Sequence, residues 1–498
     1  MAKALIKEKR FIGLRARYDA ILGSFWFKPL SMSAASVILA ISLLWLEENG
    51  FMDWIVFQNP FNPDSIRGNL ITLTVCLIGL FGVIMSVALI PFSLAVGQYG
   101  HTVVAIYMKD KGIQNVTGWF GASIFFYTAL LFVMPTTLTE ENIPAFTIAF
   151  SWTFFVGSLL VVIYFFSHVA GLLSAMTVAN LISKQTMEEI ENQRPYDRVY
   201  SYPPEMIEKF VLKKKAIEID GIKVPSRHSG YVRGIDYSRM VRKAQKRKIT
   251  LLVQKAPGDY VAVGEPLVKY IQDRSVAHRR RRFWQRASKS TRPEKVRSDR
   301  WLLKRRERLR KWERNEDLIR MVDETAISRW VNKSYNLGMQ RSLLQDLDYG
   351  LQELVVMACT ALSPAINAPL TAIICIDRLG LVLGEVTARP SPSPYKISRK
   401  EELRVISNPD TFELLMNTGF NQIRQYGHAQ FEVMERQLNA IEAIANRTTK
   451  TDHLRILQKH ADLVKNEAEQ FIGTEWGKKQ VESAYLSAVK VINSKKGN

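Results

Sequence analysis

The chain has 498 residues and a net charge of +21, from 68 Lys and Arg against 47 Asp and Glu. The charge is uneven, because residues 1–183 hold 10 basic and 9 acidic residues and the remainder holds nearly all of the excess. Whole-chain averages therefore mix two parts that meet different solvents. Three isolated cysteines without a C-x-x-C pair indicate neither a disulfide framework nor a thiolate metal site.

The first 28 residues mix basic and apolar side chains, a pattern typical of an amphipathic helix lying on the inner membrane leaflet. A solvated tail is the alternative. Four long apolar runs without Asp, Glu, Lys or Arg follow, at 29–46, 69–98, 118–137 and 145–183. Since about 20 apolar residues cross a hydrocarbon core roughly 30 Å thick, these runs predict a four-helix transmembrane domain over residues 29–183.

The basic residues that flank the four runs predict the orientation of the chain. Nine Lys and Arg lie before the first run or between the second and third, whereas the other two loops hold only Arg67. Positively charged flanks stay in the cytoplasm. We therefore expect both termini to be cytoplasmic. The fourth run is longer than one span requires and is expected to continue beyond the membrane as a stalk.

Polar and small residues of the second run are candidates for a transport pathway. Gly79 and Gly82 would let helices approach closely, including helices of different subunits. Ser86, Ser93 and Gln98 are candidate pore-lining residues, with interhelical hydrogen bonding as the alternative reading. The absence of acidic residues within the runs disfavours a proton- or cation-coupled pump.

The soluble part begins with a connector over residues 184–221, followed by alternating apolar and polar residues between Gly, Pro and Asp turns. This alternation predicts a small β-barrel domain over residues 222–271. The stretch 257–267 resembles the half-motif of barrel-sandwich hybrid domains, without a lysine placed for lipoyl or biotin attachment. The fold class expected is an α-helical membrane domain with a cytoplasmic α+β part.

An Arg-rich insertion is expected at residues 272–314, where 18 Lys and Arg face 5 Asp and Glu from residue 273 onward. Attraction to anionic lipid headgroups explains such a segment better than nucleic acid, which we regard as an unlikely partner despite three interleaved tryptophans. Helical patterning returns over residues 315–498 and predicts a helical cytoplasmic domain.

A break between two helices near residue 364 carries the most motif-like residues of this domain. Ser363 and Pro364 end the first helix, and Asn367 is expected to cap the second, in which Pro369 falls in the first turn. Arg341, Asp346 and Asn367 form a candidate polar cluster at this break. We expect the cluster to organise the helices rather than to perform chemistry.

Several segments together resemble the domain-of-unknown-function 2254 family of predicted bacterial integral membrane proteins. They are residues 98–99, 118–127, 166–168, 230–232, 258–261, 341–350, 361–372 and 423–427. The resemblance implies a bacterial inner-membrane location and no established activity. The chain departs from the family pattern at Ala368, where an Asp is usual, and at Gly100-His101-Thr102, where Ser-Pro-Arg is usual.

Three classes of function remain open. We favour a homo-oligomeric channel or passive pathway with a basic cytoplasmic vestibule. The alternative is a membrane-anchored sensor or scaffold that binds a ligand or partner through its cytoplasmic domain. An enzyme is disfavoured because nucleotide-binding, H-E-x-x-H and G-x-S-x-G motifs are absent, so no catalytic residue, cofactor or metal site is predicted. His453 and His460, seven residues apart, are expected to be an ordinary surface pair.

Overall fold

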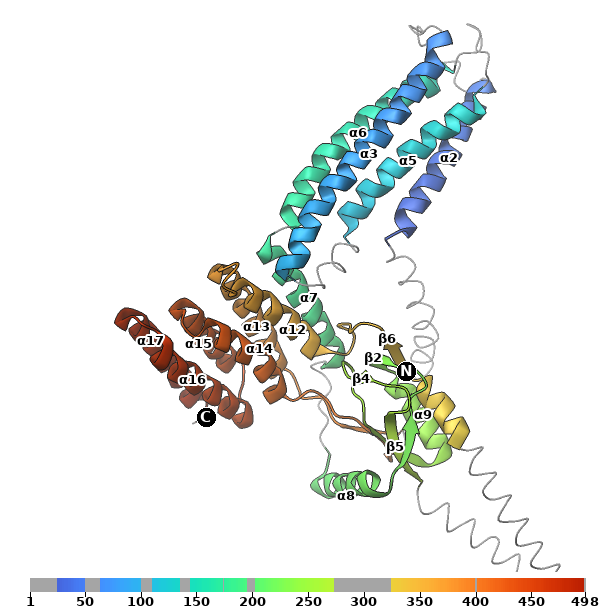
Figure 1. Ribbon diagram of the computed structural model, residues 1–498. Coiled ribbons are helices and arrows are strands. Elements are labelled where there is room, and N and C mark those ends of the chain that lie inside the picture. The colour runs from blue at the N-terminus through green and yellow to red at the C-terminus, as the bar shows by residue number, and fades with distance from the viewer. Residues whose placement is uncertain are drawn as a thin grey trace, which may run out of the picture. The chain divides into compact units, whose positions relative to one another are not determined.

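The computed structural model describes residues 25–49, 63–99, 110–134, 144–172, 174–194, 202–272, 324–398 and 401–496. The chain divides into two compact units, residues 1–181 and 182–498, each described by itself (Figure 1). The predicted N-terminal helix, apart from its last four residues, and the Arg-rich insertion, apart from Gln272, lie outside the described residues. The same holds for Gly100-His101 and for the side chain of Gln98.

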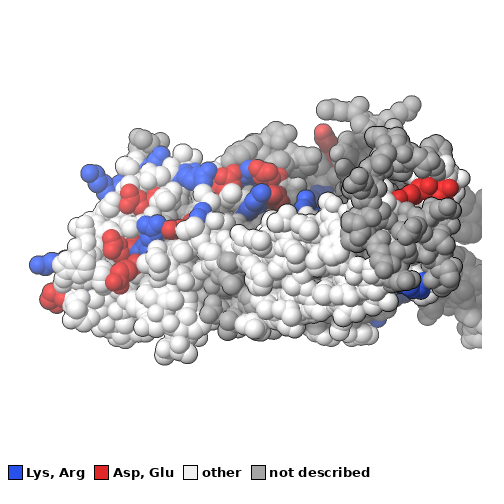
Figure 2. Space-filling view, turned by 90° about the horizontal axis from the view of Figure 1, so that it is seen from above, with Lys and Arg blue, Asp and Glu red and all other residues white. Residues whose placement is uncertain are grey.

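Long apolar helices make up the described part of the first unit. They are α2 (Phe27–Glu48), α3 (Pro63–Tyr99), α5 (Lys111–Val133) and α6 (Ala145–Leu172). Each contains a segment long and apolar enough to cross a membrane, which confirms the four predicted spans. Ile38, Val75 and Ile163 are more than 60% exposed, as a lipid-facing surface requires. Figure 2 shows a broad face without charged side chains, and most of the charged side chains in this view lie above that face and at its left end.

Helix α5 is the centre of this unit and packs against α2, α3 and α6. Two glycines of α5 explain how closely α2 approaches. A Cβ at Gly118 would lie 2.5 Å from Met32 Sδ, and one at Gly121 would lie 2.8 Å from Ser33 Oγ. Close packing of this kind holds helices together in a bilayer. The hydrophobic effect does not drive their association there, because lipid tails are as apolar as the side chains.

Polar side chains join the helices along the unit. Trp119 Nε1 donates to Ser158 Oγ at 3.0 Å, and the hydroxyls of Ser158 and Ser123 lie 3.1 Å apart. At one end, the Glu47 carboxylate accepts from the Thr147 hydroxyl and from the first backbone N–H groups of α6, which caps that helix. These hydrogen bonds satisfy polar groups that would otherwise be costly in the membrane.

The second unit begins with the rest of α7 (Ala175–Gln193) and with α8 (Pro204–Asp220). Two sheets follow. The five-stranded sheet has the order β1 (Ile222–Pro225), β5 (Pro266–Gln272), β3 (Ile249–Val253), β8 (Leu403–Ile406) and β7 (Tyr395–Ile397). The three-stranded sheet has the order β4 (Tyr260–Val261), β2 (Gly230–Ile235) and β6 (Tyr335–Gly338). Helix α9 (Tyr237–Arg247) lies between β2 and β3 in the chain.

The predicted β-barrel over residues 222–271 is not confirmed, because the described strands form two sheets and no closed barrel. One reason is local. The Asp236 carboxylate accepts from Arg239 N and caps α9, so β2 cannot continue into a hairpin with β3. The other reason is distant. Every residue of β3 is buried, and its second edge pairs in parallel with β8, about 150 residues further along the chain.

The helices that follow β6 in the chain form the largest part of the second unit. They are α12 (Leu347–Ala361), α13 (Pro369–Ala388), α14 (Phe412–Gly427), α15 (Phe431–Asn446), α16 (Thr451–Phe471) and α17 (Glu475–Lys496). Helix α12 packs against α13 and α14, and α15 packs against α13 and α17. The domain boundaries expected from the sequence stay predictions, but β7 and β8 show that strands also occur within 315–498.

The helix break after α12 corrects the predicted role of Asn367. The N-cap residue of α13 is Ala368, without a side-chain hydrogen bond. Asn367 is exposed and has a φ of +45°, a left-handed conformation that asparagine tolerates better than most residues. Its N–H donates to Ser363 O, and the N–H of Ala368 donates to Ala361 O. Asn367 therefore turns the chain between the helices, and the next residue, Ala368, is the N-cap of α13.

Replacing Ala368 with aspartate is expected to stabilise the second unit by about 1 kcal/mol, because the new carboxylate can accept from N–H groups of the first turn of α13 and is favoured by the helix dipole. The measurement is the free energy of unfolding of the full-length protein in detergent. Ala365→Asp, in the turn before the helix, is the matched control and should change little. Equal effects of the two substitutions would show that the added charge acts without capping.

Candidate functional site

Two segments that are more than 80 residues apart in the sequence meet at one point of the second unit. Gly258 has a φ of +91° and lies directly against the side chains of Arg341 and Asp346. A Cβ at Gly258 would lie 2.6 Å from Asp346 Oδ2 and 2.9 Å from Arg341 Nη2. The loop between β3 and β4 therefore covers the start of α12, and only glycine fits there.

Arg341 is the centre of a network that we call the Arg341 cluster, formed by Arg341, Asp346, Asp348, Gln352 and Thr418. Its Nε and Nη2 donate to the two carboxylate oxygens of Asp346 at 2.9 and 2.8 Å, a bidentate pair. Nη1 donates to Gln352 Oε1 at 2.8 Å, and Asp348 lies 3.3 Å from Nη2. The other oxygen of Asp348 accepts from the Thr418 hydroxyl at 2.6 Å. The cluster therefore joins α12 to α14.

Burial decides the energetics of this cluster. Asp346 is only 2% exposed, and burial raises the pKa of its carboxyl group although Arg341 opposes that shift. Asp346 also accepts from Tyr349 N at 3.0 Å and so caps α12. A buried pair of this kind is costly to break, because the remaining charge has no solvent.

A third acid, Asp410, lies near the two aspartates of the cluster. Burial, together with the charges of Asp346 and Asp348, raises the pKa of Asp410 to about 6. Arg194 donates to the backbone oxygen of Asp410 at 3.2 Å, and burial lowers the pKa of Arg194 to about 10. The region therefore holds three carboxylates against two guanidinium groups.

The end of α7 is fixed to this region, and we call these contacts the α7 clamp. Gly350 of α12 lies against Thr186, where any larger residue would collide with the threonine side chain. Glu189 accepts from Gln345 N at 3.0 Å. Arg389 donates to the carbonyl oxygen of Arg194 and pairs with Glu191 at 3.2 Å. These α7 residues belong to the second unit, so the clamp holds the last part of α7 against the start of α12 and the end of α13.

A groove of about 500 Å³ adjoins the Arg341 cluster between α12 and α14. Its lining consists of uncharged residues, which are Gln352, Val355, Val356, Asn417, Thr418, Asn421 and Gln422. The cluster fixes the positions of two of these side chains. Gln352 is hydrogen-bonded to both Arg341 and Asp348, and the Thr418 hydroxyl donates to Asp348. The groove therefore presents fixed amide and hydroxyl groups that both donate and accept hydrogen bonds.

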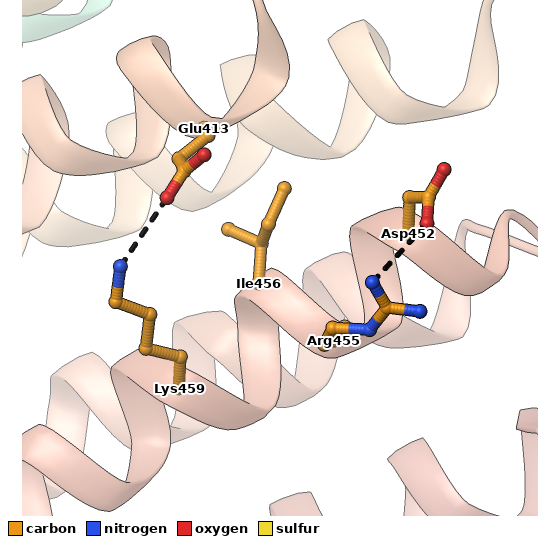
Figure 3. A pocket seen from close by; sticks show the side chains of 5 residues that line it. All are labelled: Glu413, Asp452, Arg455, Ile456 and Lys459. Carbon is orange, nitrogen blue, oxygen red and sulfur yellow. Dashed lines mark hydrogen bonds and ion pairs between the residues drawn. The ribbon is translucent and has the colours of Figure 1, made fainter.

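A second hollow, of about 310 Å³, differs from the groove in its charges. Glu413, Asp452, Arg455 and Lys459 line it together with Ile456 (Figure 3). Lys459 pairs with Glu413 and Arg455 with Asp452, and all four charged side chains are more than half exposed. Exposed pairs of this kind contribute little energy and are ordinary features of a solvated surface. The groove beside the Arg341 cluster is the better candidate site.

The comparisons with known proteins give the chain a family. The model of the family described as Predicted membrane protein (DUF2254) matches residues 23–443. The chain belongs to this family. The uncharacterized proteins Mb1321c of Mycobacterium bovis and Rv1290c of Mycobacterium tuberculosis are each 22% identical over 492 residues, which are 96% of this chain and 82% of the relative. No solved structure matches significantly.

The structure brings together only part of the polar cluster predicted from the sequence of this DUF2254 member. Arg341 and Asp346 form a bidentate pair, whereas no hydrogen bond joins Asn367 to either of them in the described part of the chain. Sequence reasoning missed Asp348 and Asp410. Asp348 lies one turn before Gln352 on α12, a spacing that could have indicated it, but no local pattern points to Asp410.

The candidate pore-lining residues of this DUF2254 member lie on α3. Ser86 and Ser93 are exposed, and their hydroxyls donate to carbonyl oxygens of their own helix, at Gly82 and Ile90. Both serines therefore lie on a surface of the unit and not inside it. A second polar pair, Asp110 with His168, was not predicted from the sequence, because Asp110 lies in a loop outside the apolar runs. His168 Nε2 lies 2.7 Å from Asp110 Oδ1 and joins α6 to the first turn of α5.

Proposed function

We propose that the chain forms a homo-oligomer in the bacterial inner membrane, with subunits that pack through the outer face of α3. This proposal rests on a stripe of small exposed residues at heptad-like spacing, which are Gly68, Gly79, Gly82, Ser86, Ser93 and Gly97. The buried residues Leu70, Leu77 and Ile84 lie on the opposite side of the helix. The stripe is therefore directed away from the core of its own unit.

The glycines of the spans support this reading by contrast. Gly118 and Gly121 of α5 are each in close contact with α2. The four glycines of the α3 stripe meet no atom within 4 Å where a Cβ would stand. The described part of the chain therefore gives no packing reason for them. A helix of a second subunit supplies such a reason, because small residues permit close approach between helices in lipid.

We further propose that the oligomer forms a passive pathway for anions or small neutral solutes between its subunits. Within one subunit, Trp119, Ser123 and Ser158 already bond to one another, and the rings of Phe126 and Phe154 pack beside them. A pathway along α3 would instead be lined by the hydroxyls of Ser86 and Ser93. The excess positive charge of residues 184–498 would raise the local concentration of anions.

Substituting Gly79 and Gly82 together by leucine is expected to convert the oligomer into monomers, because two large side chains would separate the α3 helices. Native mass spectrometry of protein released from nanodiscs measures the subunit number. Gly171→Leu is the control, since Gly171 of α6 also meets nothing within 4 Å and lies outside the stripe. A wild-type protein that is already monomeric would rule out both the oligomer and the pathway.

The orientation is a further proposal, with both termini in the cytoplasm. A single cysteine introduced at Asn142 in a cysteine-free background is expected to react with a membrane-impermeant maleimide added from the periplasmic side. A cysteine at Ser391 should be protected until the membrane is opened. The reverse pattern of labelling would place the second unit in the periplasm.

A sensor or scaffold is the second candidate, and the α7 clamp favours it. A ligand in the groove would contact Gln352 and Thr418. Both side chains are hydrogen-bonded to Asp348 in the first turn of α12, and Asp348 is paired with Arg341. Gly350 and Gln345 then contact α7, the helix that follows the fourth span. A sensor or scaffold of this kind does not require an oligomer, so a monomeric protein would be compatible with it. Neither candidate function includes catalysis.

A further inference from the structure

Helix α9 carries a concentration of positive charge that its own unit does not explain. Arg239, Arg242, Lys243 and Lys246 follow the spacing i, i+3, i+4 and i+7, so they share one side of the helix. Met240 and Ala244 occupy the opposite side and are fully buried against the sheet core. The helix contains no acidic residue.

The four side chains repel one another and are not relieved by ion pairs. Like charges three or four residues apart destabilise a helix. Among the residues that the structure describes, none of the four makes an ion pair, and Arg239 only donates to the carbonyl oxygen of Lys333 at 3.2 Å. Other helices of the unit balance their charges, as Lys465 does with Glu469 and Glu482.

Stabilisation of the helix end explains only a part of this pattern. Lys246, Arg247 and the C-cap residue Lys248 lie in the last turn, where positive charge favours the helix dipole. Arg239 lies in the first turn, where the dipole disfavours it, and Arg242 and Lys243 lie in the middle. A side chain that costs stability and gains no partner within its own unit is best explained by a partner outside it.

We propose that the basic side of α9 binds the phosphate-bearing headgroups of anionic lipids. The chain is anchored in a bilayer, so an anionic surface is present at high local concentration. Each basic side chain near such a surface strengthens the association roughly fivefold. Arg242, Lys243 and Lys246 are exposed and available for this contact. The inference does not depend on the oligomer or on the pathway proposed above.

The test uses full-length protein in nanodiscs of phosphatidylcholine alone or mixed with phosphatidylglycerol. Hydrogen exchange of the backbone amides of residues 237–248 is expected to slow by about fivefold or more in the anionic discs, and the slowing should disappear in high salt. The triple variant Arg242→Gln/Lys243→Gln/Lys246→Gln should lose this lipid dependence. A purely structural role predicts no lipid dependence in either protein.

A matched control and two contrary outcomes complete the test. Arg455→Gln/Lys459→Gln/Lys465→Gln removes three basic side chains from α16, each of which has an acidic partner, and should leave the response of α9 unchanged. Exchange of α9 that is equal in both types of disc would overturn the proposal. Slowing in phosphatidylcholine discs only after addition of a DNA oligonucleotide or polyphosphate would overturn it in favour of a soluble polyanion.

Discussion

Replacing Gly258 with alanine is expected to destabilise the second unit far more than the same change at Gly264. Both glycines have a positive φ, +91° and +86°, so both variants lose about 1 to 2 kcal/mol through backbone strain. Only at Gly258 would the new methyl group collide with Asp346 and Arg341, because nothing lies within 4 Å at Gly264. Displacing this buried pair should cost roughly 3 kcal/mol more.

Urea unfolding of the full-length protein in detergent measures both losses, and hydrogen exchange of α12 locates them. The two variants differ only in their surroundings, so the strain of the backbone cancels in the comparison. An equal loss in both would mean that the Arg341 cluster does not depend on the close approach of the Gly258 loop. In that case the Gly258 loop and the Arg341 cluster would contribute independently to the free energy of unfolding.

Acidification from pH 7 to pH 4 is expected to destabilise the helices around α16 through two buried histidines, His453 and His460, which are 8% and 1% exposed. Burial lowers the pKa of each to about 4 from an ordinary 6.5, and nearby positive charges lower it further. The folded state therefore binds fewer protons than the unfolded state. Each histidine contributes stability that is present above pH 6.5 and lost as the pH falls, by roughly 3 kcal/mol at pH 4.

Asp410 acts in the opposite direction. Its pKa is raised to about 6, so the folded state takes up this proton before the unfolded state does, and acidification through pH 6 stabilises the fold. The effect is comparable to that of one histidine, which leaves a net loss of roughly 3 kcal/mol by pH 4.

The prediction that His453 and His460 form an ordinary surface pair was wrong, because both rings are buried.

The variant His460→Leu separates these contributions. Both ring nitrogens of His460 lack a hydrogen-bond partner among the described residues, so leucine removes a buried polar group without breaking a bond. We expect the melting temperature to rise, and to rise more at pH 5 than at pH 8. His228→Leu, at an exposed position, is the control and should show no such difference. A pH-independent effect of His460→Leu would contradict the assigned shift.

The membrane helices could be predicted from the sequence because their requirement is local. A run of about 20 residues without charge has one favourable environment, and each backbone group is satisfied within its own helix. The same local logic placed most helices of the second unit. It failed where more than one local structure was possible. Residues 237–247 follow β2 in a segment rich in turns, and a helix cap at Asp236 decided their structure.

Contacts between distant segments could not be read from the sequence. The parallel pairing of Leu251 with Val405 closes the second edge of β3, and it turned an expected barrel into part of a mixed sheet. The contact of Gly258 with Asp346 depends on the same folding of the chain. The alternation within a strand indicates which of its faces is buried, but it does not specify which distant strand lies beside it, so the β3–β8 pairing could not be predicted.

The sequence by itself determined that this chain is a membrane protein of the DUF2254 family with a large, basic second part. It also indicated Arg341 and Asp346, since charged residues in a helical motif are conspicuous. Only the tertiary structure decided what surrounds them. Hydrogen bonds to Gln352 and Thr418 make the pair part of a cluster that joins α12 to α14, and burial raises the pKa of Asp410 nearby. The physical reason is that burial and electrostatic coupling depend on the surroundings of a charge, which chain order alone does not specify.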